Sequence, residues 1–208
     1  KKLELGGFGC LSGVPGTLGG AIRMNVGTSL GEIGERVIEV EWLDAQGEIQ
    51  VSTKDELMFS YRKTQGLPEK AIVTSILFEA FSRSDPQIED EPQNIQRHLQ
   101  RRKETQPLHL PSCGSVFTNP KGDYAGRLIE QAGLKGRIIG GAQISEKHAN
   151  FIVNLGGASA RDVYDLIALC RSEVYEQFSV ILHPEVRLIG DWEGSKWPPE
   201  IQSMSRDM

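Results

Sequence analysis

The sequence predicts an α+β fold in two units, and three observations lead to this prediction. Residues 37–43 alternate between apolar and polar side chains, which is typical of a β-strand. Residues 163–174 place apolar side chains on one face of a helix. Residues 82–93 are polar and acidic with two prolines, which is typical of a linker. A length of 208 residues suits one large domain or two small ones, because a domain averages about 150 residues. We expect the division to be a first domain at 1–84, a second domain at 85–190 and a tail without periodicity at 191–208.

The first domain is predicted to hold a glycine-rich loop system and a β-hairpin. Residues 6–34 contain few strong strand or helix formers, apart from a short helix expected at 19–24. Turn residues at 44–47 join the strand at 37–43 to a returning strand at 48–51, which predicts the hairpin. The other expected elements are a capped helical turn at 53–57 and a buried strand at 71–81.

Two helices are predicted before residue 134. The first, at 94–105, becomes basic toward its end and stops at Pro107. The second has Asp123 as its N-cap, runs to about Ala132 and is followed by Gly133 as its C-terminal glycine.

A third helix is predicted to begin at Ser159, where Asp162 completes a capping box. Its apolar stripe consists of Val163, Leu166, Ile167, Cys170 and Val174. The strands that flank these helices are expected at 151–155, 180–182 and 186–189.

Composition excludes several classes of protein. A net charge of −5 argues against binding to nucleic acid and against a polybasic membrane anchor. No apolar run approaches the ~20 residues that span a bilayer, and residues 1–5 lack the apolar region of a secretory signal. The three cysteines lie far apart and no histidines pair at a zinc-helix spacing, so we expect neither a disulfide framework nor a metal site. The cysteine pattern also predicts a reducing, cytoplasmic compartment.

The loop at 12–21, with the sequence SGVPGTLGGA, is the first candidate site. Its glycines allow backbone amides to approach a phosphate or a flat ring. It matches neither the dinucleotide-binding fingerprint nor a P-loop. The loop is therefore either a cluster of tight turns or a ligand-binding segment.

Four further segments each leave two interpretations open. Arg62, beside Tyr61, is either a surface residue or an anion clamp. Ser115 and Cys113 are turn residues or nucleophiles, although neither lies in a GxSxG elbow. His148 either belongs to a site or ends a solvated loop. Glu185 and Arg187 are two positions apart and so share one face of a predicted strand. They form either an ion pair at the strand edge or part of a site.

Five ordered segments together are far more specific than any one of them. They are GVPGTLGGAIRMN, SYRKT, RRKETQPLHLPSCGSVFTNPKGDYAGRLIEQAGLKG, GGAQISEKHANFIVN and HPEVRLIG. Over about residues 3–190 the chain resembles the UDP-N-acetylenolpyruvoylglucosamine reductase family, in its shorter second type. That family is also called UDP-N-acetylmuramate dehydrogenase.

The resemblance implies an NADPH-dependent flavoenzyme of peptidoglycan synthesis, which takes part in cell-wall biogenesis, cell shape and cell division. Its substrate would be enolpyruvyl UDP-N-acetylglucosamine, its product UDP-N-acetylmuramate, and its cofactors FAD and NADPH. The implied fold is the C-terminal part of a vanillyl-alcohol-oxidase-type FAD-binding domain, followed by an α+β substrate-binding domain. Family members carry a further flavin-binding part upstream, which is expected to be absent here. A monomer that contacts no nucleic acid or membrane is expected.

The resemblance also implies the site residues. The catalytic residues would be Arg62, Ser115 and Glu185, which are expected to converge over the flavin ring, with Ser115 as the proton donor. The flavin contacts would be Gly13, Pro15, Gly16, Thr17, Gly19, Gly20, Ala21 and Asn25. The substrate contacts would be Arg102, Gln106, Asn119, His148 and Arg187. Thr118 stands where many family members have lysine.

Two alternatives remain open from the sequence. One is a non-catalytic remnant that binds the UDP-sugar but not FAD, because the upstream flavin motifs are absent. The other is a hydrolase that uses Ser115 or Cys113 with His148, for which no triad spacing is present.

Overall fold

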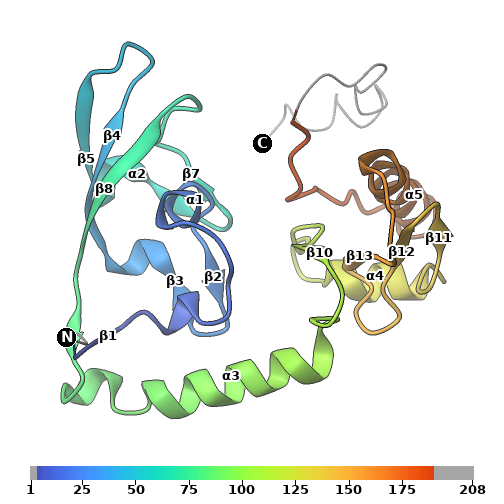
Figure 1. Ribbon diagram of the computed structural model, residues 1–208, viewed down its shortest axis with the longest axis horizontal. Helices are drawn as coiled ribbons and strands as arrows, with labels where there is room; N and C mark the ends of the chain where they lie inside the picture. The colour runs from blue at the N-terminus through green and yellow to red at the C-terminus, as the bar shows by residue number, and fades with distance from the viewer. Residues whose placement is uncertain (1–3, 190–208) are drawn as a thin grey trace. The chain divides into compact units, whose positions relative to one another are not determined.

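The computed structural model describes residues 4–189, which form two compact units that divide between Glu104 and Thr105 (Figure 1). The sequence had predicted the division at 84/85. The boundary lies later because helix α3 (Glu91–Thr105) is bonded to the first unit. Both carboxylate oxygens of Glu91 accept hydrogen bonds from the backbone N–H of Gly7, at 3.1 and 2.9 Å. The predicted tail at 191–208 lies outside the described residues.

The first unit contains a three-stranded antiparallel sheet in the order β5-β4-β8. Its strands are β4 (Val37–Leu43), β5 (Ile49–Thr53) and β8 (Ile72–Phe78). The predicted hairpin is confirmed, and Asp44 shapes its turn by accepting the N–H groups of Gln46 and Glu48, each at 2.9 Å. These hydrogen bonds lower the pKa of the Asp44 carboxyl.

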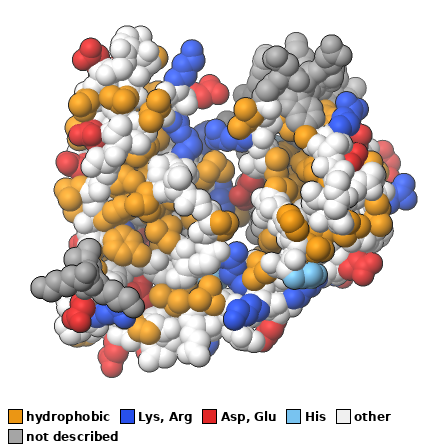
Figure 2. All heavy atoms as spheres, viewed as in Figure 1, with side chains coloured by type: hydrophobic (Ala, Val, Ile, Leu, Met, Phe, Trp, Pro, Cys, Tyr) orange, Lys and Arg blue, Asp and Glu red, His pale blue; other side chains and the backbone are white. Residues whose placement is uncertain are grey.

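The prediction that residues 71–81 form a buried strand is wrong in its burial. Strand β8 is shorter, and Ile72 and Leu77 are 63% and 51% exposed. Only one face of the sheet packs on the core, through Val40 and its neighbours Val73 and Ile76. The opposite face leaves apolar side chains in contact with solvent, and hydrophobic atoms are visible over this sheet in Figure 2. A run of apolar residues does not by itself distinguish a strand with one buried face from one with two.

Short elements fill the segment at 6–34, which the sequence predicted to be loops around one helix. The helix is confirmed as α1 (Leu18–Arg23).

The other short strands and helices of this unit are β1 (Leu5–Gly6), η1 (Gly9–Leu11), β2 (Gly27–Thr28), β3 (Gly31–Glu32), η2 (Ile33–Arg36), β6 (Phe59–Ser60), β7 (Lys63–Thr64) and β9 (Phe81–Ser82). The predicted helical turn is confirmed as α2 (Lys54–Leu57), with Thr53 and Glu56 forming a capping box. Ile22, Ile33, Val37, Val40 and Leu57 form the centre of the core.

The polar segment at 82–93 is not a free linker. It contains the short helix η3 (Pro86–Ile88), whose N-cap Asp85 accepts the N–H of Gln87 at 2.9 Å. It also supplies the first turn of α3, three residues before the predicted start. Glu91 could not be recognised as the beginning of the helix because its partners, Gly7 and Gly9, are more than 80 residues away.

The second unit is a four-stranded antiparallel sheet covered by two helices. The strand order is β10-β13-β12-β11, with β10 (Ser112–Ser115), β11 (Ile138–Ile139), β12 (Ala142–Ile144) and β13 (Phe151–Asn154). Helices α4 (Ala125–Gln131) and α5 (Ala160–Phe178) complete the unit. The predicted capping box is confirmed, with Ser159 accepting the Asp162 N–H at 3.1 Å and Asp162 accepting the Ser159 N–H at 2.9 Å. The hydrogen bonds that the Asp162 carboxylate accepts from the backbone N–H groups of Ser159 and Gly141 lower its pKa.

The predicted apolar stripe of α5 supplies much of the hydrophobic core of the second unit. Leu166, Ile167, Cys170 and Val174 are buried, and Val163 packs against them in part. They belong to one apolar cluster with Val116 and Phe117 and with Leu128 and Ile129 of α4. Burial raises the pKa of the Cys170 thiol to about 12, so this thiol remains protonated.

Two further predictions need correction in this unit. Helix α4 begins at Ala125, because Asp123 does not cap it but accepts the Tyr124 N–H and pairs with Arg127. The predicted strands at 180–182 and 186–189 are absent. The chain there forms one antiparallel bridge, between Pro184 and Phe117. Pro184 has no N–H and cannot extend a ladder.

Within residues 4–189, no helix is both long and apolar enough to cross a membrane. The same described range holds no group of three or more His, Cys, Asp or Glu side chains suited to a metal ion.

We expect Leu166→Ala to destabilise the second unit by about 2–5 kcal/mol, because it removes a fully buried side chain and leaves a cavity. Urea unfolding followed by circular dichroism measures the loss. Leu155→Ala is the matched control, since Leu155 is 48% exposed and surface changes stay within about 0.5 kcal/mol. Equal losses for the two variants would contradict the described core.

We expect Gly66→Ala to destabilise the first unit by about 1–3 kcal/mol through overpacking. A Cβ at Gly66 would lie 1.9 Å from the Glu56 carbonyl oxygen, which is backbone and cannot rotate away. At Gly20 the nearest atom would be 3.4 Å away. Gly20→Ala should therefore be neutral or slightly stabilising in thermal unfolding, and a larger loss at Gly20 than at Gly66 would refute this packing.

Candidate functional site

The glycine-rich loop presents its backbone to solvent around Gly16. Gly16 has φ 139°, and a Cβ there would meet nothing within 4 Å. Pro15, Thr17 and Gly20 are exposed, whereas Ala21 is buried in the core. Thr17 caps α1 by accepting the Gly20 N–H at 3.2 Å. The exposed part of the loop is thus accessible to a flat ring or a phosphate, as its composition predicts.

Gly13, by contrast, lies against α3. A Cβ at Gly13 would come within 2.8 Å of Leu99 and 2.9 Å of the Arg102 guanidinium, and φ is 74°. Arg102 also donates to the Ser12 carbonyl at 3.5 Å. The structure therefore brings a predicted flavin contact and a predicted substrate contact side by side within the first unit.

Arg62 is held by its backbone and by its side chain. Its φ is 57°, a conformation that non-glycine residues adopt at a cost. Its Nη2 donates to the Gly27 carbonyl at 2.9 Å, and its guanidinium lies 4.9 Å from the ring centroid of Tyr61. Arg62 is partly buried, and a planar guanidinium group is well suited to binding a carboxylate or phosphate.

Asn25 is hydrogen-bonded to the hairpin of strands β6 and β7, which carries Arg62 at its turn. It is 1% exposed, with φ 40°. Its amide nitrogen donates to the Ser60 carbonyl at 2.9 Å and to Glu32 at 2.5 Å, and its oxygen accepts the Gly34 N–H at 3.0 Å. The side chain of this predicted flavin contact is thus engaged within the protein, where it supports the strand that leads to Arg62.

Ser115 and Glu185 lie on adjacent segments of the second unit. Ser115 ends β10, is exposed and pairs with Phe151 across the sheet. The N–H of Glu185 donates to the carbonyl of Val116, the residue after Ser115, at 2.8 Å. The structure therefore brings together two of the three predicted catalytic residues, and Arg62 belongs to the first unit.

Asn119 and His148 both have one polar atom engaged. Asn119 accepts the N–H of Ala125 at 3.1 Å and so caps α4. His148 Nδ1 accepts the N–H of Asn150 at 3.2 Å, which leaves the proton on Nε2. Burial, followed by the nearby charge of Lys135, lowers the pKa of His148, so the ring is neutral at pH 7 and can donate from Nε2.

The remaining predicted substrate contacts lie at the two ends of the second unit. Gln106 is partly buried near its start, where its carbonyl accepts the Leu108 N–H at 2.9 Å. Arg187 is exposed, two residues beyond Glu185. The roles of these residues stay predictions.

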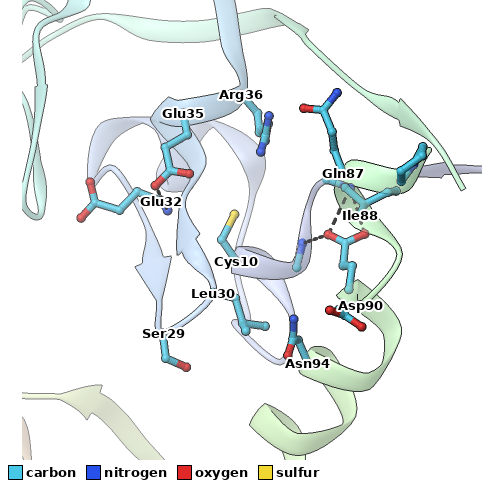
Figure 3. Close-up of a pocket in the computed structure, with 14 residues that line it drawn as sticks. Cys10, Ser29, Leu30, Glu32, Glu35, Arg36, Gln87, Ile88, Asp90 and Asn94 are labelled. Carbon is cyan, nitrogen blue, oxygen red and sulfur yellow. Dashed lines mark hydrogen bonds between the residues drawn. The ribbon is translucent and has the colours of Figure 1, made fainter.

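A cavity of about 430 Å³ lies elsewhere in the first unit (Figure 3). Cys10 lies at its base, and the carboxylates of Glu32, Glu35 and Asp90 border it. Burial raises the pKa of the Cys10 thiol. None of the predicted site residues lines this cavity, and its acidic border disfavours a phosphate or diphosphate.

The hydrolase alternative gains no support from the geometry. Within residues 4–189 no hydrogen bond joins Ser115 or Cys113 to His148, whose Nδ1 is already occupied. Burial raises the pKa of the Cys113 thiol, whereas a nucleophilic cysteine needs a lowered one.

Sequence reasoning did not assign a role to Asn150, Glu32 or Glu91. Each is a polar side chain that holds backbone or another side chain. The partners of Asn150 and Glu91 lie 33 and 82 residues away in the chain, whereas Glu32 holds Asn25, seven residues before it. Only for Asn150 was a signal present, since it lies within one of the specific segments at 140–154.

Comparisons with known proteins identify similar sequences and a similar fold. A family model described as UDP-N-acetylenolpyruvoylglucosamine reductase, C-terminal domain, matches residues 106–189. A reductase of that name from Synechococcus sp. (strain JA-3-3Ab) is 47% identical over 182 residues, covering 87% of this chain and 57% of that protein. One from Aquifex aeolicus (strain VF5) is 43% identical over 196 residues, covering 94% of this chain and 64% of that protein.

A solved structure is also similar. The crystal structure of UDP-N-acetylenolpyruvylglucosamine reductase from Thermus caldophilus matches with a TM-score of 0.73 and 38% identity, over 88% of this chain and 64% of that one. The chain thus spans 57% to 64% of the length of these three relatives. Residues 106–189 match the C-terminal domain of the UDP-N-acetylenolpyruvoylglucosamine reductase family, and over most of its length the chain is similar in sequence and in fold to reductases of that name.

Proposed function

We propose that this chain forms part of an NADPH-dependent flavoenzyme that reduces enolpyruvyl UDP-N-acetylglucosamine to UDP-N-acetylmuramate for peptidoglycan. The observation that supports the proposal is the backbone hydrogen bond from Glu185 to Val116, which brings the backbone at Glu185 next to the end of the strand that carries Ser115. A carboxyl and a hydroxyl group carried by these two segments would suit the addition of a proton to a carbon that has gained negative charge.

The exposed glycine loop fits a flavin in part. The open backbone at Gly16 and the exposed Thr17 and Gly20 would hold FAD, because no side chain blocks approach there. Asn25 and Ala21 are buried, so they would support the flavin-binding loop from within the protein. The unit would then be the C-terminal part of a flavin domain of the vanillyl-alcohol-oxidase type. When bound, FAD accepts a hydride from NADPH and supplies it to the β-carbon of the enolpyruvyl group.

The protein groups would stabilise the charge that this reduction creates. Negative charge develops on the α-carbon and spreads into the substrate carboxylate. Arg62 would bind that carboxylate through two parallel hydrogen bonds. Glu185, in its protonated form, would donate a hydrogen bond to the enediolate-like oxygen. Ser115 would donate its proton to the α-carbon and recover one from solvent, and so it needs no histidine base.

The rest of the proposed site would bind the UDP part of the substrate. Arg102 and Gln106, with Asn119, His148 and Arg187, are the proposed contacts. The end of α3 adds positive charge from Arg97, Arg101 and Lys103, which favours a diphosphate although the whole chain is acidic.

The direct test is turnover by the purified chain supplied with FAD. We expect flavin absorbance to remain with the protein after gel filtration, and NADPH oxidation to depend on the enolpyruvyl sugar, because the loop and the acid–base groups are all present. A colourless chain that still binds the UDP-sugar would overturn the flavoenzyme proposal and would identify a binding remnant.

The proton-donor role of Ser115 is tested by separating the two half-reactions in stopped flow. We expect Ser115→Ala to leave flavin reduction by NADPH unchanged and to slow reoxidation by the enolpyruvyl sugar about 10²–10⁴-fold, the usual loss of a general acid. Ser112→Ala, at the other end of β10, is the matched control and should affect neither step. Equal loss of both half-reactions in Ser115→Ala would rule out the role.

A further inference from the structure

Asn150 connects two backbone segments through a buried side chain. It is 4% exposed. Its Oδ1 accepts the N–H of Phe117 at 2.9 Å, and its Nδ2 donates to the carbonyl of the same residue at 2.8 Å. Its own carbonyl accepts the N–H of Val116 at 2.9 Å. One side chain thus satisfies both polar groups of the Phe117 backbone, as a neighbouring strand would.

The segment held by Asn150 in turn holds the chain that carries Glu185. Phe117 forms the antiparallel bridge with Pro184. The Thr118 N–H donates to the His183 carbonyl at 3.0 Å, and the Glu185 N–H donates to the Val116 carbonyl at 2.8 Å. Residues 116–118 therefore lie between Asn150 on one side and residues 183–185 on the other.

The position of Asn150 is itself fixed. Its N–H donates to His148 Nδ1 at 3.2 Å, and the next residue, Phe151, donates to the His148 carbonyl at 3.0 Å. The Ser145 N–H donates to the Phe151 carbonyl at 2.8 Å. The amide therefore extends from a tight turn at the start of β13, a rigid place from which to fix a neighbour.

An asparagine is required for this arrangement because its amide both donates and accepts. Val116 and Phe117 are 1% and 2% exposed, so water cannot replace a lost partner. A buried backbone N–H or carbonyl without a partner is strongly unfavourable, and the segment would move to find one. Such movement would displace Ser115 at one end and Glu185 at the other.

We propose that Asn150 is a positioning residue that fixes the Ser115 hydroxyl and the Glu185 carboxyl in the geometry needed for proton delivery. The inference rests on the proposed function and extends it to a residue that touches neither substrate nor cofactor. A displacement of about 1 Å can slow a reaction up to about 100-fold. Removal of Asn150 should therefore impair the proton-delivery step selectively.

The experiment compares Asn150→Ala, Asn150→Asp and the control Val174→Ala in the full chain. Alanine removes both hydrogen bonds to Phe117, whereas aspartate keeps the size and an acceptor but removes the donor. Val174 is fully buried on α5 in the same core, so its truncation destabilises the unit without removing a hydrogen bond at 116–118. Two readouts are measured: amide hydrogen exchange at Phe117, Thr118 and Glu185, and the two half-reactions in stopped flow.

We expect exchange at Thr118 and Glu185 to rise at least about 10-fold more in Asn150→Ala than in Val174→Ala. Flavin reoxidation at saturating sugar should slow about 10–100-fold, with flavin reduction by NADPH and sugar affinity unchanged. Asn150→Asp should show the same selective slowing, because its second carboxylate oxygen would face the Phe117 carbonyl to which the Asn150 amide donates. Exchange and reoxidation that match the Val174→Ala control would overturn the inference. If Asn150→Ala does not fold, Asn150→Asp decides by the same two readouts.

Failure of the proposed function can be distinguished from failure of this inference by the behaviour of the wild-type chain. A wild-type chain that shows no reoxidation by the sugar would contradict the proposed function and with it the catalytic part of this inference. Exchange at Thr118 and Glu185 would then still decide whether Asn150 holds the two segments.

Discussion

The pair of hydrogen bonds between the Asn150 amide and the Phe117 backbone is the constraint on which the second unit depends. Phe117 lies in the middle of the apolar core, yet its backbone has no partner in a regular ladder on that side. Without the amide, two buried polar groups would oppose the burial of the Phe117 ring. With it, the chain can leave β10, cross the core and pair with residues 183–185.

The first unit uses a similar solution. Asn25, almost fully buried, joins the η2 segment through Gly34 to the hairpin that bears Arg62, through Ser60. Both asparagines bind irregular backbone close to a proposed site residue, which is Arg62 for Asn25 and Ser115 for Asn150. Irregular backbone of this kind can orient side chains toward a site. A buried asparagine amide then supplies the hydrogen-bond partners that the backbone would otherwise find in a strand or helix.

Local patterns were enough to predict several of the regular elements, but not the short strands β10, β11 and β12 or the distant contacts. The 37–53 hairpin, α1 and the Ser159 capping box follow from alternation, turn residues and caps within a few positions. The unit boundary and the start of α3 depend on Glu91 meeting Gly7 and Gly9, which no local window contains. The site residues came from resemblance to a family, because single motifs such as SYRKT or SCGS suit a surface turn equally well. The structure then added what spacing cannot give, namely the bonding of Glu185 to Val116.

We propose that this chain helps to deliver a proton to the α-carbon of an enolpyruvyl group as that group is reduced. The most direct measurement is nuclear magnetic resonance of the product formed in heavy water from the chain, FAD, NADPH and the enolpyruvyl sugar. We expect a lactyl product with one deuterium at the α-carbon, because the donating hydroxyl exchanges with solvent. Absence of the product, or a product with hydrogen at that carbon, would contradict it.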